Sequence, residues 1–383
     1  MVIPFIGGNV MRTLLATSAL VATLLAPASA QTLRIGLQED PDTLDGAKNW
    51  SFVGRVVMTS ICDKLVDIAP DSSIVPMLAT SWETAADGKA ITFKLRPGVR
   101  FHDGEPFDAA AVKYNIERHL TMPGSARRSD IRPIAGVEVI DEHTAKITLS
   151  APFAPLLVQL AYNAGAMMSP KAARAAGENF GSHPVCSGPF KFVERVAQER
   201  IVLERFADYW DKDKIKVDRI VYLPFPDATV RLANLQSGGL DLIEGVAPSD
   251  LDTLRQDPRL RLAAVNGLGY GGIAINVANG ERAKTPIGQD ARVRHALELS
   301  IDREELNHVV FDGEFQPGNQ WVAPTNPYYV KELPIPARDV AKAKALLCCR
   351  GRTQSGRHDD GIQRVPGYAD CPGHPGDGQG ERF

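Results

Sequence analysis

The sequence predicts an α/β protein with more than one compact part. Short stretches in which apolar and polar residues alternate, as in half-buried strands, are interleaved with stretches that keep the spacing of an amphipathic helix. The chain of 383 residues is also longer than one hydrophobic core normally supports. No low-complexity linker or repeat interrupts residues 31–347. We therefore expect two or three subdomains.

The predicted strands are short and bounded by turn residues. Ile91, Phe93 and Leu95 alternate with polar neighbours as on a strand with one buried face. The Asp-Gly pairs at 87–88 and 103–104 fit tight turns that need positive φ. Further strands are expected at 33–37, 145–149, 190–193, 201–205 and 220–223.

The predicted helices carry recognisable N-terminal caps. Asp108 is suited to cap a helix in which Val112, Ile116 and Leu120 fall on one apolar face. Two more helices are expected at 229–237 and 290–300, and a third follows the capping box formed by Asp302 and Glu305. A helix is also expected at 341–347.

The stretch from Ala79 to Arg118 holds many short motifs in a fixed order. They are Trp82-Glu83, Asp87-Gly88, Thr92-Phe93, Leu95-Arg96, Gly98-Val99 and Phe101-His102-Asp103-Gly104. This order resembles the signature of the family 5 extracellular solute-binding proteins, the peptide-binding and dipeptide-binding receptors of bacterial ABC importers. Blocks around 209–211, 231–238 and 292–306 extend the resemblance over most of the chain.

The resemblance implies an α/β, two-lobed type II periplasmic binding protein fold of the large peptide-binding class. It would assign 31–48 and 183–265 to the core of lobe I, 49–182 to an extra subdomain of lobe I, and 266–347 to the beginning of an incomplete lobe II. The glycine-rich stretch 267–272 suits a hinge between lobes, because glycine accepts large changes in φ and ψ. A glycine-rich strand entry without motion is the alternative.

The first thirty residues predict a secretory signal. They contain one charged residue, Arg12, then an apolar run from Leu14 to Ala26 and the small-residue site Ala28-Ser29-Ala30. The apolar run is shorter than the ~20 residues that a membrane-spanning helix needs. We expect cleavage after Ala30 and a periplasmic location.

Charge and motif content argue against two other classes of function. The chain has 43 basic and 46 acidic residues, a formal net charge of −3, and no basic run, which argues against nucleic-acid binding. A hydrolase would need Ser187 or Cys186 as nucleophile with His183 nearby, but the Gly-x-Ser-x-Gly elbow is missing. We expect a monomer that is not an enzyme and needs no cofactor or metal.

Two cysteines lie within otherwise family-like motifs. Cys62 and Cys186 would be able to pair in an oxidising compartment. Two separate buried thiols are the equal alternative, since sequence does not give the distance between the Cα atoms.

The resemblance also indicates where a solute would be contacted. It places contacts just after the first strand, and four later positions are further candidates: the loop at 162–165, the turn at 186–188, the crossing near 270 and the loop at 318–321. The candidate residues are Gln38, Glu39, Asp40, Tyr162, Asn163, Ser187, Tyr270 and Trp321. The acids would meet a ligand ammonium, and the aromatics would cover apolar surface or a cation. Solvated turn acids and core aromatics are the alternatives.

The implied function is capture of a peptide-like small solute between two lobes and its delivery to an ABC permease in the inner membrane. Opines, glutathione and nickel chelates remain open as ligands. Presentation of a ligand to a membrane chemoreceptor is the alternative role, because it needs the same sequence features.

The last segment, 348–383, departs from the rest of the chain. Among residues 349–383, Gly and Pro supply 11 of 35, while Leu, Ile, Val and Phe supply three. Such a composition buries too little apolar surface to offset the entropy of ordering, so we expect a disordered tail, of the kind that a shifted reading frame produces. A metal-binding tail is the alternative, but the spacing of its residues matches no zinc pattern: Cys348, Cys349, His358, Cys371 and His374.

Overall fold

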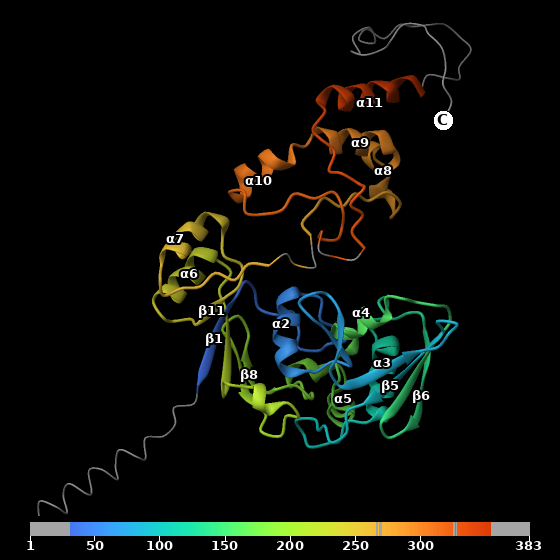
Figure 1. Ribbon diagram of the computed structural model, residues 1–383, viewed down its shortest axis with the longest axis vertical. Coiled ribbons are helices and arrows are strands. Elements are labelled where there is room, and N and C mark those ends of the chain that lie inside the picture. Colours follow the sequence, from blue (N-terminus) through green and yellow to red (C-terminus); the bar gives the residue numbers. More distant parts are fainter. Residues whose placement is uncertain (1–30, 266, 268–269, 325, 327, 354–383) are drawn as a thin grey trace, which may run out of the picture. The chain divides into compact units, whose positions relative to one another are not determined.

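The computed structural model describes residues 31–265, 267, 270–324, 326 and 328–353. The expected signal peptide and the part of the tail from residue 354 lie outside the described residues. The chain divides into two compact units, of which unit 1 ends at Val246 and unit 2 begins at Ala247. Each unit is described by itself (Figure 1). The lobe and subdomain boundaries given above stay a prediction.

Unit 1 contains a five-stranded sheet built from two separate parts of the chain. Its order is β11-β1-β10-β9-β8, and β1 runs parallel to both of its neighbours while β8, β9 and β10 are antiparallel. The strands are β1 (Thr32–Leu37), β8 (Phe190–Val196), β9 (Arg200–Arg205), β10 (Arg219–Pro224) and β11 (Leu242–Ile243). The expected strand at 190–193 is longer than predicted, because β8 pairs with β9 as far as Val196 opposite Arg200.

One face of this sheet is covered by helix α2 (Phe52–Ile61). Val57 and Ile61 of the helix are buried against Leu37 and Tyr222 of the sheet in one apolar cluster. The hydroxyl groups of Ser60 and Tyr222 lie 2.7 Å apart and share a hydrogen bond. These contacts fix α2 along the sheet.

A second, four-stranded sheet lies between β1 and β8 in the sequence. Its order is β4-β5-β7-β6 and every pair is antiparallel: β4 (Ala79–Thr84), β5 (Ala90–Leu95), β6 (Ile134–Asp141) and β7 (Thr144–Leu149). Ile91, Phe93 and Leu95 are buried as their alternation predicts, and they pack with α3 (Ala109–Thr121) in a second apolar cluster.

The expected caps and turns are confirmed. The Asp108 carboxylate accepts a hydrogen bond of 2.7 Å from the backbone amide of Ala111 at the start of α3. Asp302 caps α10 (Arg303–Phe311) of unit 2 in the same way, through the amide of Glu305. Gly88 and Gly104 have φ of 67° and 83°, which L side chains rarely adopt.

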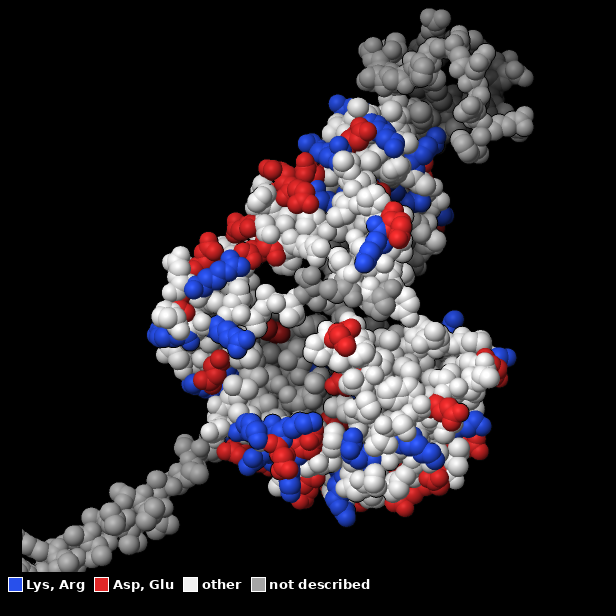
Figure 2. Space-filling model, in the orientation of Figure 1, with Lys and Arg blue, Asp and Glu red and all other residues white. Residues whose placement is uncertain are grey.

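The remaining elements of unit 1 are short. They are β2 (Val66–Ile68), β3 (Ile74–Pro76), α4 (Leu156–Leu160), α5 (Pro170–Ala176), α6 (Ala228–Gln236) and the 3₁₀ turns η2 (Asn163–Gly165), η3 (Gly177–Ser182) and η4 (Lys212–Lys214). On the outside of the five-stranded sheet, basic and acidic side chains alternate, as Figure 2 shows over the region of β8. Cross-strand pairs such as Lys191 with Glu204 and Arg200 with Glu194 account for this surface.

Unit 2 is helical in the part that the structure describes. It contains η5 (Pro248–Asp250), α7 (Leu251–Gln256), η6 (Glu281–Ala283), α8 (Pro286–Gln289), α9 (Ala291–Ser300), α10 (Arg303–Phe311) and α11 (Val340–Thr353). Ala296 and Leu299 of α9 pack against Ala343 and Leu346 of α11. The glycine-rich stretch expected to act as a hinge lies partly outside the described residues, so its role stays a prediction.

Candidate functional site

A cavity of about 360 Å³ opens in unit 1 at the beginning of α2. One wall is the segment that enters the helix, Asn49 to Phe52, together with Arg55 one turn into it. The opposite wall comes from the end of α4 and the residues after it, Gln159, Tyr162 and Asn163. Arg127, from the loop after α3, completes the lining. A cavity of this size is within the range of small-molecule sites.

Exposed aromatic rings and guanidinium groups alternate around this cavity. The side chains of Trp50 and Phe52 are 73% and 60% exposed. The Arg55 guanidinium lies 4.7 Å from the centre of the Phe52 ring and 5.0 Å from that of Tyr162. The Arg127 guanidinium lies 5.6 Å from the centre of the Trp50 ring. Rings stacked on cations in this way leave the N–H groups of each cation at the rim.

The two cations differ in their partners. Arg127 forms an ion pair of 2.9 Å with Asp130 and donates to the carbonyl oxygen of Asn49 at 3.2 Å. Arg55 has neither a carboxylate partner nor a side-chain hydrogen bond within the described part of the chain. The residues that line the cavity include no acid. Of the two cations that line the cavity, Arg55 is thus the one without an acidic partner in the described part of the chain.

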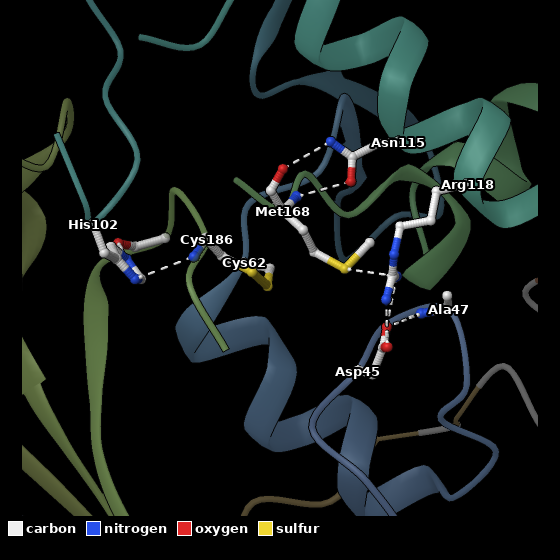
Figure 3. The surroundings of a disulfide bond; sticks show 9 residues. Asp45, Ala47, Cys62, His102, Asn115, Arg118, Met168 and Cys186 are labelled. Carbon is white, nitrogen blue, oxygen red and sulfur yellow. Dashed lines mark hydrogen bonds and ion pairs between the residues drawn. A yellow bond between two sulfur atoms is a disulfide. The ribbon is translucent and has the colours of Figure 1, made fainter. Parts of the chain in front are cut away.

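The segment that enters α2 is held by a buried ion pair (Figure 3). The Arg118 guanidinium donates to both oxygens of Asp45, at 2.9 and 2.6 Å, and the two side chains are 7% and 1% exposed. One of the same carboxylate oxygens also accepts from the amide of Ala47 at 2.9 Å. The carbonyl oxygen of Asp45 accepts from the amides of Lys48 and Asn49. Asp45 thus fixes the turn that leads to the cavity wall.

Asn49 connects the two walls. Its side-chain amide donates to Asp42, and its side-chain oxygen accepts from Asn163 at 3.1 Å. The other oxygen of Asp42 accepts from the backbone amide of Trp50 at 2.8 Å. This network orders the backbone that carries both exposed aromatic rings.

The opposite end of α2 is tied down by a disulfide. Cys62, directly after the helix, is bonded to Cys186, with the Cα atoms 4.9 Å apart and both residues buried (Figure 3). His102 holds the backbone on both sides of Ser187, next to the disulfide. Its Nδ1 accepts from the amide of Cys186 at 3.3 Å, and its Nε2 donates to the carbonyl of Gly188 at 2.9 Å. Burial lowers the pKa of His102 to about 4, so the ring is neutral at pH 7.

The structure brings together two of the eight predicted contact residues, Tyr162 and Asn163. Gln38 and Glu39 are exposed just after β1. The carboxylate of Asp40 is paired with Arg195 at 2.9 Å.

Three predicted contacts lie elsewhere. Ser187 is fully buried, and its hydroxyl has no hydrogen-bond partner among the described residues. Tyr270 and Trp321, in unit 2, are 68% and 77% exposed. The contacts of Asp40, Ser187, Tyr270 and Trp321 with a solute stay predictions.

Sequence reasoning missed seven of the nine lining residues, and four of the seven carry an aromatic ring or a guanidinium group: Trp50, Phe52, Arg55 and Arg127. A signal for three of them was present: two aromatic side chains separated by Ser51, the N-cap of α2, with an arginine one turn later. Within the described ranges, no group of three or more His, Cys, Asp or Glu side chains is arranged to hold a metal ion. Those ranges also contain no helix long and apolar enough to cross a membrane.

Comparison with known proteins assigns the chain to a family. The family 5 middle segment of the bacterial extracellular solute-binding proteins matches residues 73–357. The chain belongs to this family. Its members are solute-binding proteins of the periplasm, and the expected resemblance is therefore confirmed.

Relatives within the family include the glutathione-binding proteins GsiB. The protein from Pectobacterium atrosepticum is 32% identical over 332 residues, covering 86% of this chain and 63% of the relative. That from Salmonella typhimurium is 32% identical over 320 residues, covering 83% of this chain and 61% of the relative. The chain thus spans less than two thirds of the length of these relatives.

Solved structures of the family share the fold. AgaA from A. tumefaciens R10 in complex with agropinic acid superposes with a TM-score of 0.73 at 30% identity, over 84% of this chain and 64% of that one. DppA from Helicobacter pylori in complex with the peptide STSA gives 0.74 at 26% identity, over 84% and 66%. The fold is the α/β type II periplasmic binding protein fold of the large peptide-binding class, as predicted.

Proposed function

We propose that this chain is the periplasmic solute-binding component of an ABC importer, which binds a peptide-like small solute and delivers it to the permease in the inner membrane. The chain acts as a monomer without a cofactor and carries out no catalysis. It reaches the periplasm through a signal peptide that is cleaved after Ala30. Membership of the solute-binding family supports this role.

The observation that carries the proposal is the cavity at the start of α2. It combines exposed apolar rings with side-chain amides and an uncompensated guanidinium, which suits a small solute with both polar and apolar parts. Related proteins are named for binding glutathione, and solved neighbours hold agropinic acid or a peptide. A peptide-like solute fits both the ligands of these related proteins and the groups that line the cavity.

A thermal-unfolding screen of the secreted protein tests the proposal. The probes are reduced glutathione, the dipeptide Met-Leu and the tetrapeptide STSA. A probe that binds only the folded protein stabilises it by RT ln(1 + [L]/Kd), about 2.7 kcal/mol at a concentration of 100 Kd. We expect concentration-dependent stabilisation by at least one probe, whereas sodium chloride at matched ionic strength should leave the unfolding midpoint unchanged.

A Phe52→Ala variant supplies the site-specific check. Phe52 is 60% exposed, so its removal costs little folding stability but deletes one wall of the cavity. Stabilisation by the probe should fall in this variant. Equal stabilisation of both proteins would place the binding site elsewhere.

A further inference from the structure

We infer that Arg55 selects solutes that carry a free carboxylate, an inference that rests on the proposed function of the cavity. The selection depends on three properties of this one side chain: its stacking between two rings, its missing acidic partner, and the lack of any acid in the lining around it. Each property can be argued separately from the structure.

The stacking orients the guanidinium. Phe52 precedes Arg55 by three residues on the same face of α2, and Tyr162 belongs to the other wall. The guanidinium carbon lies 4.7 Å from the centre of the Phe52 ring and 5.0 Å from that of the Tyr162 ring, so both rings contact this group. Contacts with ring faces use the π surface of a guanidinium and leave its N–H edge free. That edge matches a carboxylate in bidentate geometry.

Arg55 differs from Arg127, the other cation of the cavity, because its charge has no acidic partner within the described chain. Arg127 is already neutralised by Asp130 and uses one of its nitrogens to hold the backbone of Asn49. For Arg55, the described chain supplies neither a carboxylate nor a carbonyl acceptor. A solute carboxylate would therefore be the first anion that Arg55 meets.

The residues around Arg55 do not favour binding of a solute ammonium group. A solute ammonium group would find side-chain amides here, from Asn49, Gln159 and Asn163, but no carboxylate. Next to an uncompensated guanidinium, an ammonium group is also repelled. The substrate class is thus a small organic acid of peptide-like character, with its carboxylate at Arg55 and its apolar part against the exposed rings.

The test compares each probe with a form that lacks the negative charge. Reduced glutathione is paired with its diethyl ester, and Met-Leu with its C-terminal amide. Titration calorimetry at one fixed ionic strength is carried out on the wild-type protein and on Arg55→Met, Arg55→Lys and Arg174→Met. Arg174 is the matched control, since it also stacks on a tyrosine, at 4.4 Å from the ring of Tyr114, but does not line the cavity.

We expect the wild type to bind a free acid at least tenfold more tightly than its ester or amide. In Arg55→Met, affinity for the acid should fall at least tenfold while affinity for the ester or amide changes less than threefold, so the preference for the carboxylate is lost. Arg55→Lys should retain part of the preference, because it keeps the charge and loses the bidentate edge. Arg174→Met should behave as the wild type.

Two results would overturn the inference while leaving the proposed function in place. One is a wild type that binds the acid and its ester or amide equally. The other is an Arg55→Met variant that binds both forms more weakly by the same factor, since Arg55 would then contribute packing but no recognition of the carboxylate. A wild type that binds neither these four probes nor STSA would contradict both the inference and the proposed function. Circular dichroism of each variant establishes that the fold is retained.

Discussion

Arg118 and Asp45 meet as a buried bidentate ion pair, with N–O distances of 2.9 and 2.6 Å, directly beneath the segment that enters the cavity. Arg118 belongs to α3, which packs on the four-stranded sheet, whereas Asp45 lies after β1 of the five-stranded sheet. The pair thus links two sheets of unit 1 and orders the turn before Asn49. Its strength and its position lead to the first prediction.

We expect Arg118→Met to lower the free energy of unfolding by about 3–5 kcal/mol, because it leaves the Asp45 carboxylate buried without a counter-charge. The measurement is urea denaturation followed by circular dichroism. The control is Arg205→Met, which removes an ion pair with Asp218 whose side chains are 44% and 37% exposed and should cost at most about 1 kcal/mol. Equal losses in the two variants would contradict a special role for the buried pair.

The disulfide gives the second prediction. Cys62 and Cys186 are separated by 124 residues, and a cross-link that closes a loop of this length restricts the unfolded chain strongly. A Cys62→Ala/Cys186→Ala double variant should lose about 2–5 kcal/mol of unfolding free energy. Peptide mapping of the wild type without reductant should yield a linked pair of peptides containing these two cysteines. Recovery of both peptides as free thiols would contradict the bond.

The third prediction concerns Asp63, which follows the disulfide in the sequence. Burial raises the pKa of this carboxyl to about 7, although Trp210 donates to it at 2.6 Å and Tyr209 at 3.2 Å. Between the ordinary pKa of about 3.8 and about 7, the folded state therefore binds more protons than the unfolded state. The contribution of Asp63 to stability consequently falls as the pH rises through this window.

An Asp63→Asn variant isolates this effect. Relative to the wild type, its free energy of unfolding should rise by up to about 4 kcal/mol between pH 4 and pH 8 and then remain level. His102 and His119, whose pKa values burial lowers to about 4 and about 3, make both proteins less stable as the pH falls below 6.5, and the difference between the proteins cancels that trend. A difference that stays constant from pH 4 to pH 8 would show that Asp63 titrates at its ordinary pKa.

The fourth prediction reverses an ordinary rule for glycine in helices. Gly54 lies within α2, where alanine is normally more stable by about 1 kcal/mol. A Cβ at this position would lie 1.9 Å from the side-chain nitrogen of Asn49. Asn49 is buried, its side-chain nitrogen donates to Asp42, and its side-chain oxygen accepts from Asn163. Gly54→Ala should therefore destabilise the protein by about 1–3 kcal/mol and weaken binding of the probes. Increased stability with unchanged binding would mean that Asn49 moves freely.

The parts of the fold that sequence predicted are those decided by neighbouring residues. Asp108 and Asp302 cap their helices through amides three residues later, and Ile91, Phe93 and Leu95 are buried through simple alternation. These features need no information from distant chain, which is why local patterns were sufficient.

The cavity depends on contacts that local patterns do not contain. Arg55, Arg127 and Tyr162 come from three different segments, which only the tertiary fold brings together. Asp40 illustrates the converse: it was a candidate because it follows β1, but Arg195 of β8 pairs with it once the sheet is assembled. Only the tertiary structure shows that Asp40 has a charged partner and that Arg55 has none within the described chain.

The central claim is that the cavity at the start of α2 binds a small solute. Titration calorimetry of the wild type and of Phe52→Ala with reduced glutathione, Met-Leu and STSA tests it most directly. The account predicts saturable binding of at least one probe to the wild type, with an affinity at least tenfold lower for Phe52→Ala. Equal affinities for the two proteins, or no saturable heat from any probe, would contradict it.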